Sequence, residues 1–148
     1  MQYKEEIRDL FSVSKDYYLA HCISTDFGMG KGIAVEFNKK FEMKRILKGK
    51  YPDFINDYRN NKLGGTVLIE GQVINLITKE RYWQKPTYDT LQAALNAAKS
   101  QLPPDCKKIA MPIIGCGLDR LQWNKVSEII KDVFKDTDID ILVCRKSL

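Results

Sequence analysis

The chain has few of the residues that build metal centres and disulfide frameworks. Its 148 residues include a single histidine and four cysteines, and the cysteines contain no C-x-x-C pair. Dispersed cysteines and one histidine do not match the ligand spacing of a zinc site. We therefore expect free thiols in a reducing compartment, no metal and no cofactor.

Long apolar runs are also missing. No stretch approaches the ~20 apolar residues that span a bilayer, and the first six residues lack the apolar region of a signal peptide. We expect a cytoplasmic protein with no membrane partner. The length and the absence of repeats or linkers predict a single domain over residues 1–148, and we expect it to be a monomer.

The charge balance favours anionic partners. The formal net charge is +5, but the basic residues are interleaved with acidic ones instead of forming a block. Nucleotides and nucleic acids both suit such a surface. The charge therefore points to a class of ligand without selecting one.

Strand-like and helix-like patterns alternate along the chain. Apolar runs predict strands at 3–7, 17–23, 66–69, 73–78, 109–114 and 139–144, with a hairpin between the third and fourth. Helical spacing predicts helices at 32–40, 46–58 with an interruption at Pro52, 86–98 and 126–134. This alternation predicts an α/β fold in which helices cover both faces of a mixed sheet.

Three segments follow predicted strands and could line one cleft, because ligands of such sheets bind beyond the carboxyl ends of the strands. They are Asp9, residues 24–32 and residues 113–120. The third is a glycine-rich bend that ends in Asp119, a pattern suited to cradling phosphate with backbone N–H groups. The glycines at 28–32 are read equally well as a flexible loop or as an anion site.

His21 and Cys22 invite comparison with a catalytic Cys–His dyad. Neighbouring residues on a strand point to opposite faces, so these two side chains cannot easily meet. We expect both to pack in the core. Cys116 has no histidine partner, and its predicted role is to keep the glycine-rich bend tight.

Lys79 ends a hydrophobic strand, an unusual place for a long cation. From position alone, the simplest interpretation is that its ammonium group reaches out to solvent from an apolar stem. The alternative is a nucleophile, which requires loss of a proton and is helped by a nearby cation such as Arg81. Asp119 would then accept a proton or orient the ligand.

Several blocks, taken together, resemble the macrodomain superfamily and, more narrowly, its terminal ADP-ribose protein glycohydrolase branch. The resemblance covers nearly the whole chain, and two of the blocks, residues 111–123 and the Leu76–Lys79 run, are specific to that branch. The blocks are Arg8-Asp9-Leu10-Phe11, His21-Cys22-Ile23-Ser24, Met29-Gly30-Lys31-Gly32-Ile33-Ala34, Leu76-Ile77-Thr78-Lys79, Lys85-Pro86-Thr87-Tyr88 and residues 111–123.

The resemblance implies a three-layer α/β/α macrodomain with a mixed central sheet and a pocket for ADP-ribose. Asp9 and Leu10 would hold the adenine. Lys79 would attack the anomeric carbon of the distal ribose and form a covalent lysyl adduct, with Asp119 assisting proton transfer. The pyrophosphate and distal ribose would contact Ser24, Gly30, Gly32, Ile33 and Ala34, and the phosphates would contact Ile113, Ile114, Gly115, Cys116, Gly117 and Leu118.

The resemblance also orders the possible functions. The leading hypothesis is a hydrolase that removes mono-ADP-ribose from carboxylate esters on proteins, from O-acetyl-ADP-ribose or from nucleobases in DNA, so ADP-ribosylated DNA is a possible partner. A phosphatase acting on ADP-ribose 1″-phosphate is the runner-up, because Lys31 stands where relatives often carry a small residue. A non-catalytic ADP-ribose reader would not need both Lys79 and Asp119. Arg8 replaces a common glycine beside the adenine pocket.

Overall fold

A computed structural model of the chain describes residues 1–117 and 120–147, which form one mixed sheet with helices on both faces. The strand order is β1-β6-β5-β2-β4-β3, and every neighbouring pair is parallel except β3 with β4. The predicted mixed sheet is therefore confirmed. The strands are β1 (Gln2–Ile7), β2 (Tyr18–Ser24), β3 (Thr66–Glu70), β4 (Val73–Lys79), β5 (Lys108–Met111) and β6 (Asp140–Arg145).

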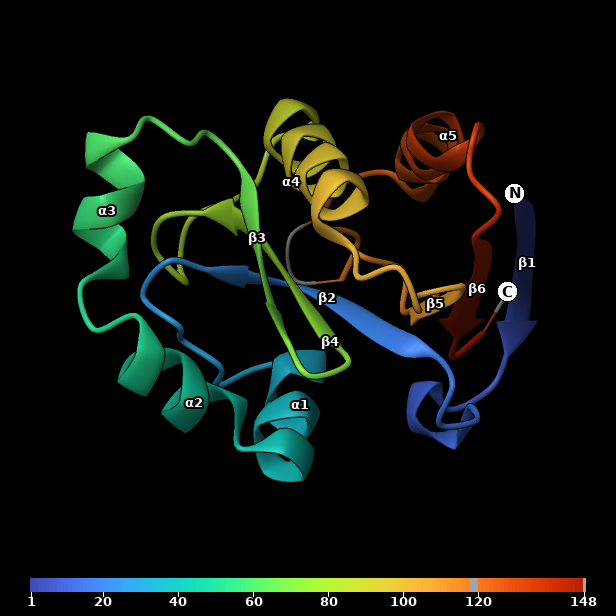
Figure 1. The fold of residues 1–148 in the computed structure, drawn as a ribbon, viewed down its shortest axis with the longest axis horizontal. Helices are drawn as coiled ribbons and strands as arrows, with labels where there is room; N and C mark the ends of the chain where they lie inside the picture. Colours follow the sequence, from blue (N-terminus) through green and yellow to red (C-terminus); the bar gives the residue numbers. More distant parts are fainter. Residues whose placement is uncertain (118–119, 148) are drawn as a thin grey trace.

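The helices lie in two layers. α4 and α5 cover one face of the sheet and α1, α2 and α3 lie on the other, as Figure 1 shows. This arrangement confirms the predicted three-layer α/β/α architecture. The helices are the 3₁₀ turn η1 (Leu10–Ser12), α1 (Ile33–Phe41), α2 (Met43–Lys50), α3 (Phe54–Asn60), α4 (Tyr88–Gln101) and α5 (Trp123–Phe134).

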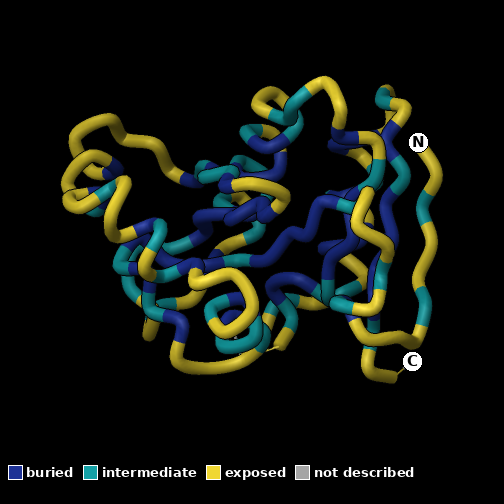
Figure 2. The backbone as a smooth tube through the Cα atoms, turned by 60° about the horizontal axis from the view of Figure 1, so that its bottom comes forward, coloured by how far each residue is buried: buried dark blue, intermediate teal, exposed yellow. Residues whose placement is uncertain are grey.

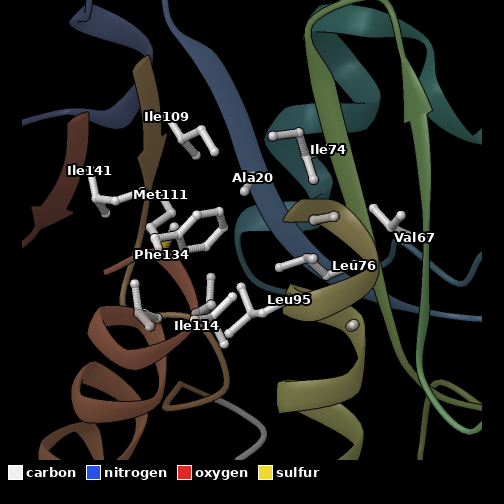
Figure 3. Close-up of a cluster of buried hydrophobic side chains, with 14 of the residues drawn as sticks. Ala20, Val67, Ile74, Leu76, Leu95, Ile109, Met111, Ile114, Phe134 and Ile141 are labelled. Carbon is white, nitrogen blue, oxygen red and sulfur yellow. The ribbon is translucent and has the colours of Figure 1, made fainter. Parts of the chain in front are cut away.

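Alternation along the strands builds a separate core on each face of the sheet. On the α4 and α5 side, Ala20 and Leu76 pack with Leu95 and Phe134 of the helices (Figure 3). The intervening residues, such as Ile77, pack with α1 to α3 on the opposite face. Figure 2 shows the consequence: the central strands are buried, whereas β1 at the edge is exposed over much of its length. Two packed faces leave the strand ends and loops to carry the site.

The helices begin and end at residues that interrupt or cap a helix. The predicted interruption at Pro52 is confirmed, because α2 ends before it and α3 begins after it. A further break separates α1 from α2 at Glu42, whose φ of 51° is left-handed. α4 begins after Thr87, which shares a capping box with Thr90. The second part of the predicted helical stretch 46–58 is α3, which buries Phe54 and Tyr58.

The strand predicted at 109–114 extends too far at its C-terminal end. The apolar run 109–114 continues past Met111, but β5 stops there and the N–H of Ile114 donates to the carbonyl of Pro112 at 2.8 Å. Proline has no N–H to give to a strand ladder, so the chain turns at this point despite its apolar side chains. The turn moves residues 113 and 114 from the sheet into the loop at its edge.

The predicted hairpin is confirmed. β3 and β4 pair antiparallel with Glu70 opposite Val73, and the turn between them places Gly71 at φ 57°. β4 is thereby fixed between β3 and β2, with Lys79 as its last residue. Within the described residues, no helix is long and apolar enough to cross a membrane.

Candidate functional site

The carboxyl ends of the five parallel strands share one edge of the sheet, and the sequence-predicted site residues that the structure describes follow four of them. Asp9 comes after β1, residues 24–32 after β2, Lys79 at the end of β4 and residues 112–117 after β5. The strand order separates β1 from β4 by four strand spacings, roughly 19 Å. The candidate site is therefore long, with Asp9 at one end and Lys79 at the other.

At the first end, Asp9 caps the η1 turn. Its Oδ1 accepts a hydrogen bond from the N–H of Phe11 at 3.0 Å, and the next residue, Leu10, is buried. Arg8 donates from Nε to the hydroxyl of Ser12 at 3.0 Å and pairs with Glu6. The arginine that replaces the expected glycine therefore fastens the turn that carries Asp9.

At the other end, Lys79 is joined directly to the loop after β2. Ser24 is its register partner across the β2–β4 pair, at a bulge between Ile23 and Ser24. The N–H of Thr25 donates to the carbonyl of Lys79 at 3.0 Å, and the Thr25 hydroxyl donates to the carbonyl of Glu80 at 2.7 Å. Ser24 and Lys79, predicted to act on the same ribose, are thus brought together.

Asp26 holds this junction and was missed by the sequence analysis. Its carboxylate accepts from the hydroxyl of Ser24, from the N–H of Gly28 at 3.2 Å and from the N–H of Tyr82 at 3.1 Å. The signal that could have found it is its place two residues before a glycine in a loop, which is typical of an Asx turn. Asp26 ties the loop after β2 to the segment that follows Lys79.

The glycine loop leads into α1 as predicted. Gly30 and Lys31 are exposed, and Gly32 caps the helix with a φ of 67° that favours glycine. Ile33 begins α1 and Ala34 is buried beneath it. The first N–H groups of a helix have no partner within the helix, so this turn can receive a phosphate.

The bend after β5 folds back on itself. The N–H of Cys116 donates to the carbonyl of Ile113 at 3.2 Å, and that of Leu121 donates to Gly115 at 2.7 Å. Gly115 is buried with a φ of 73°, and a Cβ there would lie 3.1 Å from a methyl carbon of Leu121. Gly117 is exposed. The sequence predicts this tight, glycine-dependent loop correctly; the predicted roles of Leu118 and Asp119 concern positions outside the described residues.

His21 and Cys22 have the structural places that were expected. His21 is fully buried, its Nε2 lies 2.6 Å from Oδ1 of Asn75, and its ring stacks on Phe37 with centroids 3.8 Å apart. Burial lowers the pKa of His21 to about 4, although the hydrogen bond to Asn75 opposes the shift. Cys22 packs with the cluster on the other face of the sheet. The two side chains therefore form no dyad.

The remaining cysteines do not build a reactive centre. None of the four cysteines forms a disulfide, and burial raises the pKa of both Cys106 and Cys144 to about 11. Across residues 1–117 and 120–147, no three His, Cys, Asp or Glu side chains are grouped so as to hold a metal ion.

Comparisons with known proteins identify relatives of the chain. No family model matches it. Human ADP-ribose glycohydrolase OARD1 is 46% identical over 137 residues, covering 91% of this chain and 86% of the relative. The macrodomain of Mycobacterium tuberculosis DarG matches in structure with a TM-score of 0.74 over 99% of both chains at 21% identity. Thermosipho africanus DarTG in complex with ADP-ribose matches with a TM-score of 0.72 at 16% identity, covering 97% of this chain and 41% of that one.

Proposed function

The chain belongs to the ADP-ribose glycohydrolase branch of the macrodomain superfamily, and on this premise we propose that it removes mono-ADP-ribose from modified acceptors with Lys79 as the nucleophile. The observation that carries the proposal is the junction of Lys79 with Ser24 and Thr25 at the end of β4. A lysine in register with the serine at the start of the ligand loop is in place to meet a sugar held by that loop.

The proposed ligand lies along the strand ends. Asp9 and Leu10 hold the adenine, and the α1 N-terminus and the 113–117 bend supply N–H groups to the pyrophosphate. The distal ribose then reaches Ser24 and Lys79. The length of the edge between β1 and β4 supports this order, because it offers separate places for the two ends of a dinucleotide-like ligand.

The proposed reaction has two steps. In the first, the neutral amine of Lys79 attacks the anomeric carbon of the distal ribose, the bond from that carbon to the acceptor breaks, and the acceptor leaves with its electron pair and gains a proton. In the second, water hydrolyses the lysyl adduct and releases ADP-ribose and the free amine. We assign to Asp119 the acceptance and return of the proton. Each step conserves atoms and consumes only water.

The acceptor that we favour is a nucleobase in DNA. The net charge of +5 supports an anionic acceptor. Esters of protein carboxylates and O-acetyl-ADP-ribose are the competing acceptors for the same chemistry.

The test compares the parent with Lys79→Ala and with Lys62→Ala, an exposed lysine in the loop before β3. Substrates are an ADP-ribosylated single-stranded oligonucleotide, an ADP-ribosylated glutamate peptide, O-acetyl-ADP-ribose and ADP-ribose 1″-phosphate. We expect Lys79→Ala to lower kcat by about 10³-fold or more while ADP-ribose still binds, and Lys62→Ala to match the parent. Borohydride added during turnover should reduce the ring-opened imine form of the lysyl adduct to a stable amine, located at residue 79 by mass spectrometry.

Other results would overturn the proposal in distinct ways. Phosphate release from the 1″-phosphate, without release of ADP-ribose from the other substrates, would support a phosphatase. Tight binding with every substrate left intact would support a reader. Turnover retained in Lys79→Ala would exclude the lysine mechanism while keeping the hydrolase.

A further inference from the structure

Two large aromatic side chains stand in solvent immediately after the strand that carries Lys79. Tyr82 is 62% exposed and Trp83 is 67% exposed, more than the other large hydrophobic residues exposed in the described part of the chain. Side chains of this size are normally buried, so two exposed neighbours beside a candidate site mark a contact surface. We call this pair the aromatic shelf.

The backbone of the shelf is fixed to the site. The N–H of Tyr82 donates to Asp26, and the segment packs so closely that a Cβ on Gly28 would lie 2.8 Å from Cβ of Tyr82. In Figure 1 the loop that follows β4 lies beside the loop that follows β2. The shelf therefore lies where the loops after β2 and β4 meet, beside the candidate site.

A closed turn presents Trp83. The N–H of Gln84 donates to the carbonyl of Arg81 at 3.0 Å, and the N–H of Arg81 donates back to the Gln84 side chain at 2.8 Å. These two bonds join the residues on either side of the aromatic pair. The shelf thus needs little ordering when a partner binds, which favours affinity.

The charge around the shelf is positive. Arg81 and Lys85 flank it, and Lys31 is exposed on the neighbouring glycine loop. The nearest acid in sequence, Glu80, is neutralised by Arg59, whose guanidinium donates to both carboxylate oxygens at 2.9 and 3.2 Å. Asp26 places one negative charge beside Tyr82, and its hydrogen-bond donors are neutral groups. The three cations Arg81, Lys85 and Lys31 therefore outnumber this one acid next to the aromatic shelf.

From this combination we propose that the aromatic shelf stacks nucleobases of a single-stranded nucleic-acid acceptor, next to the nucleotide that carries ADP-ribose. Single-strand-binding surfaces combine stacking aromatics with cations that follow the phosphates. Arg81, Lys85 and Lys31 take the role of those cations. The inference rests on the proposed function for the reaction, but the shelf itself can be tested without turnover.

The binding test uses an unmodified dT10 oligonucleotide. Stacking should quench the fluorescence of Trp83; in a Trp123→Phe background it is the chain's only tryptophan. We expect Tyr82→Ala and Trp83→Ala each to weaken dT10 binding by about tenfold to a hundredfold, with Trp83→Phe restoring most of the affinity. Lys85→Ala should lower the salt slope by about 0.7, the value for one phosphate contact on a single strand.

The turnover test compares acceptors on the same variants. For Trp83→Ala we expect KM to rise for the ADP-ribosylated oligonucleotide and to stay unchanged for the ADP-ribosylated glutamate peptide, with ADP-ribose affinity unaltered. Leu63→Ala, a 39% exposed apolar residue before β3, is the matched control and should change neither substrate. A selective rise in KM is the signature of an acceptor surface.

Several outcomes would contradict the proposal that the aromatic shelf stacks nucleobases. An equal loss with both substrates would mean that the segment only supports Lys79, and a loss confined to the peptide would make the surface a polypeptide site. Unchanged dT10 binding in both alanine variants would exclude stacking. If no substrate is turned over by the parent but the shelf variants still lose dT10 affinity, the proposed function fails while the nucleic-acid surface stands.

Discussion

The carboxylate of Asp26 accepts a hydrogen bond from the backbone N–H of Tyr82 at 3.1 Å, joining the loop after β2 to the loop after β4. The same carboxylate binds the Ser24 hydroxyl and the Gly28 N–H through its other oxygen. One side chain therefore fixes the relative positions of two loops whose parent strands are already paired. Its removal should affect the site more than the sheet.

We expect Asp26→Asn to lower the free energy of unfolding by about 1 to 3 kcal/mol, because an amide has one acceptor oxygen where the carboxylate uses two. Misplaced loops should also reduce kcat about tenfold or more. Chemical unfolding and steady-state kinetics measure the two effects. Asp53→Asn, at an exposed aspartate before α3, is the control and should be nearly neutral; equal losses in both variants would contradict the special role of Asp26.

Gly28 should not tolerate a methyl group. Its Cβ would lie 2.8 Å from Cβ of Tyr82, closer than side-chain carbons approach in folded proteins, so one loop must move. We expect Gly28→Ala to destabilise the protein by about 1 to 3 kcal/mol in a thermal unfolding series. Gly49→Ala in α2, where no described atom lies within 4 Å of the new carbon, should instead stabilise it by up to about 1 kcal/mol.

His21 should make the stability depend on pH. Its pKa is about 4 in the folded protein and about 6.5 when unfolded, so between these values the unfolded chain binds a proton that the folded chain does not. The free energy of unfolding should fall as pH falls through this window, by about 1.5 kcal/mol between pH 6.5 and pH 5.

The variant that tests this is His21→Phe, which keeps a ring against Phe37 but leaves Oδ1 of Asn75 without its partner. We expect lower stability than the parent at pH 7 and a smaller loss on acidification. Urea unfolding at pH 7, 6 and 5.5 measures the difference, and the chain has no other histidine to obscure it. Parallel pH profiles for the two proteins would contradict the assignment.

Glu5 should hold the edge strand to α5. It accepts from Tyr3 at 2.6 Å, Arg145 at 2.7 Å and the Trp123 indole at 3.1 Å, and these bonds lower the pKa of its carboxyl although burial acts to raise it. Glu5→Gln should cost about 1 kcal/mol at pH 7, measured by chemical unfolding.

A control variant and the pH dependence test whether the effect of Glu5→Gln comes from this hydrogen-bond network. Glu6→Gln on the same strand removes only the longer contact with Arg8, at 3.4 Å, and should stay within about 0.5 kcal/mol of the parent. Because the pKa of Glu5 is lowered on folding, its contribution is present above the unfolded pKa and is lost as pH falls through the folded one. A gap between parent and Glu5→Gln that persists at low pH would contradict the network.

The sequence predicts the fold well where local patterns decide it. The run 73–78 is mostly apolar because β4 is buried on both faces, and the glycine before Gln72 supplies the left-handed turn of its hairpin. The same reasoning extends β5 too far, since apolar character alone does not show that the chain turns at Pro112. Patterns of hydrophobicity report burial, not the direction of the backbone.

The sequence predicts only the part of the candidate site that local residue patterns reveal. Ser24, Lys79 and the 113–117 bend carry recognisable residue types, and the structure describes each at the same edge of the sheet. Asp26 and Trp83 were missed, because their importance comes from contacts and exposure that no local pattern records. An aromatic pair after a strand predicts burial by composition, yet here both rings face solvent.

The position of β1 has a consequence for how the protein is made. β1 pairs with β6, Gln2 opposite Asp140, so the partners lie at opposite ends of the chain. During synthesis β1 cannot pair with β6 until residues 140–145 have left the ribosome. Asp9 is therefore translated long before the strand that fixes its place, and the growing chain can order the Lys79 end of the candidate site before the Asp9 end.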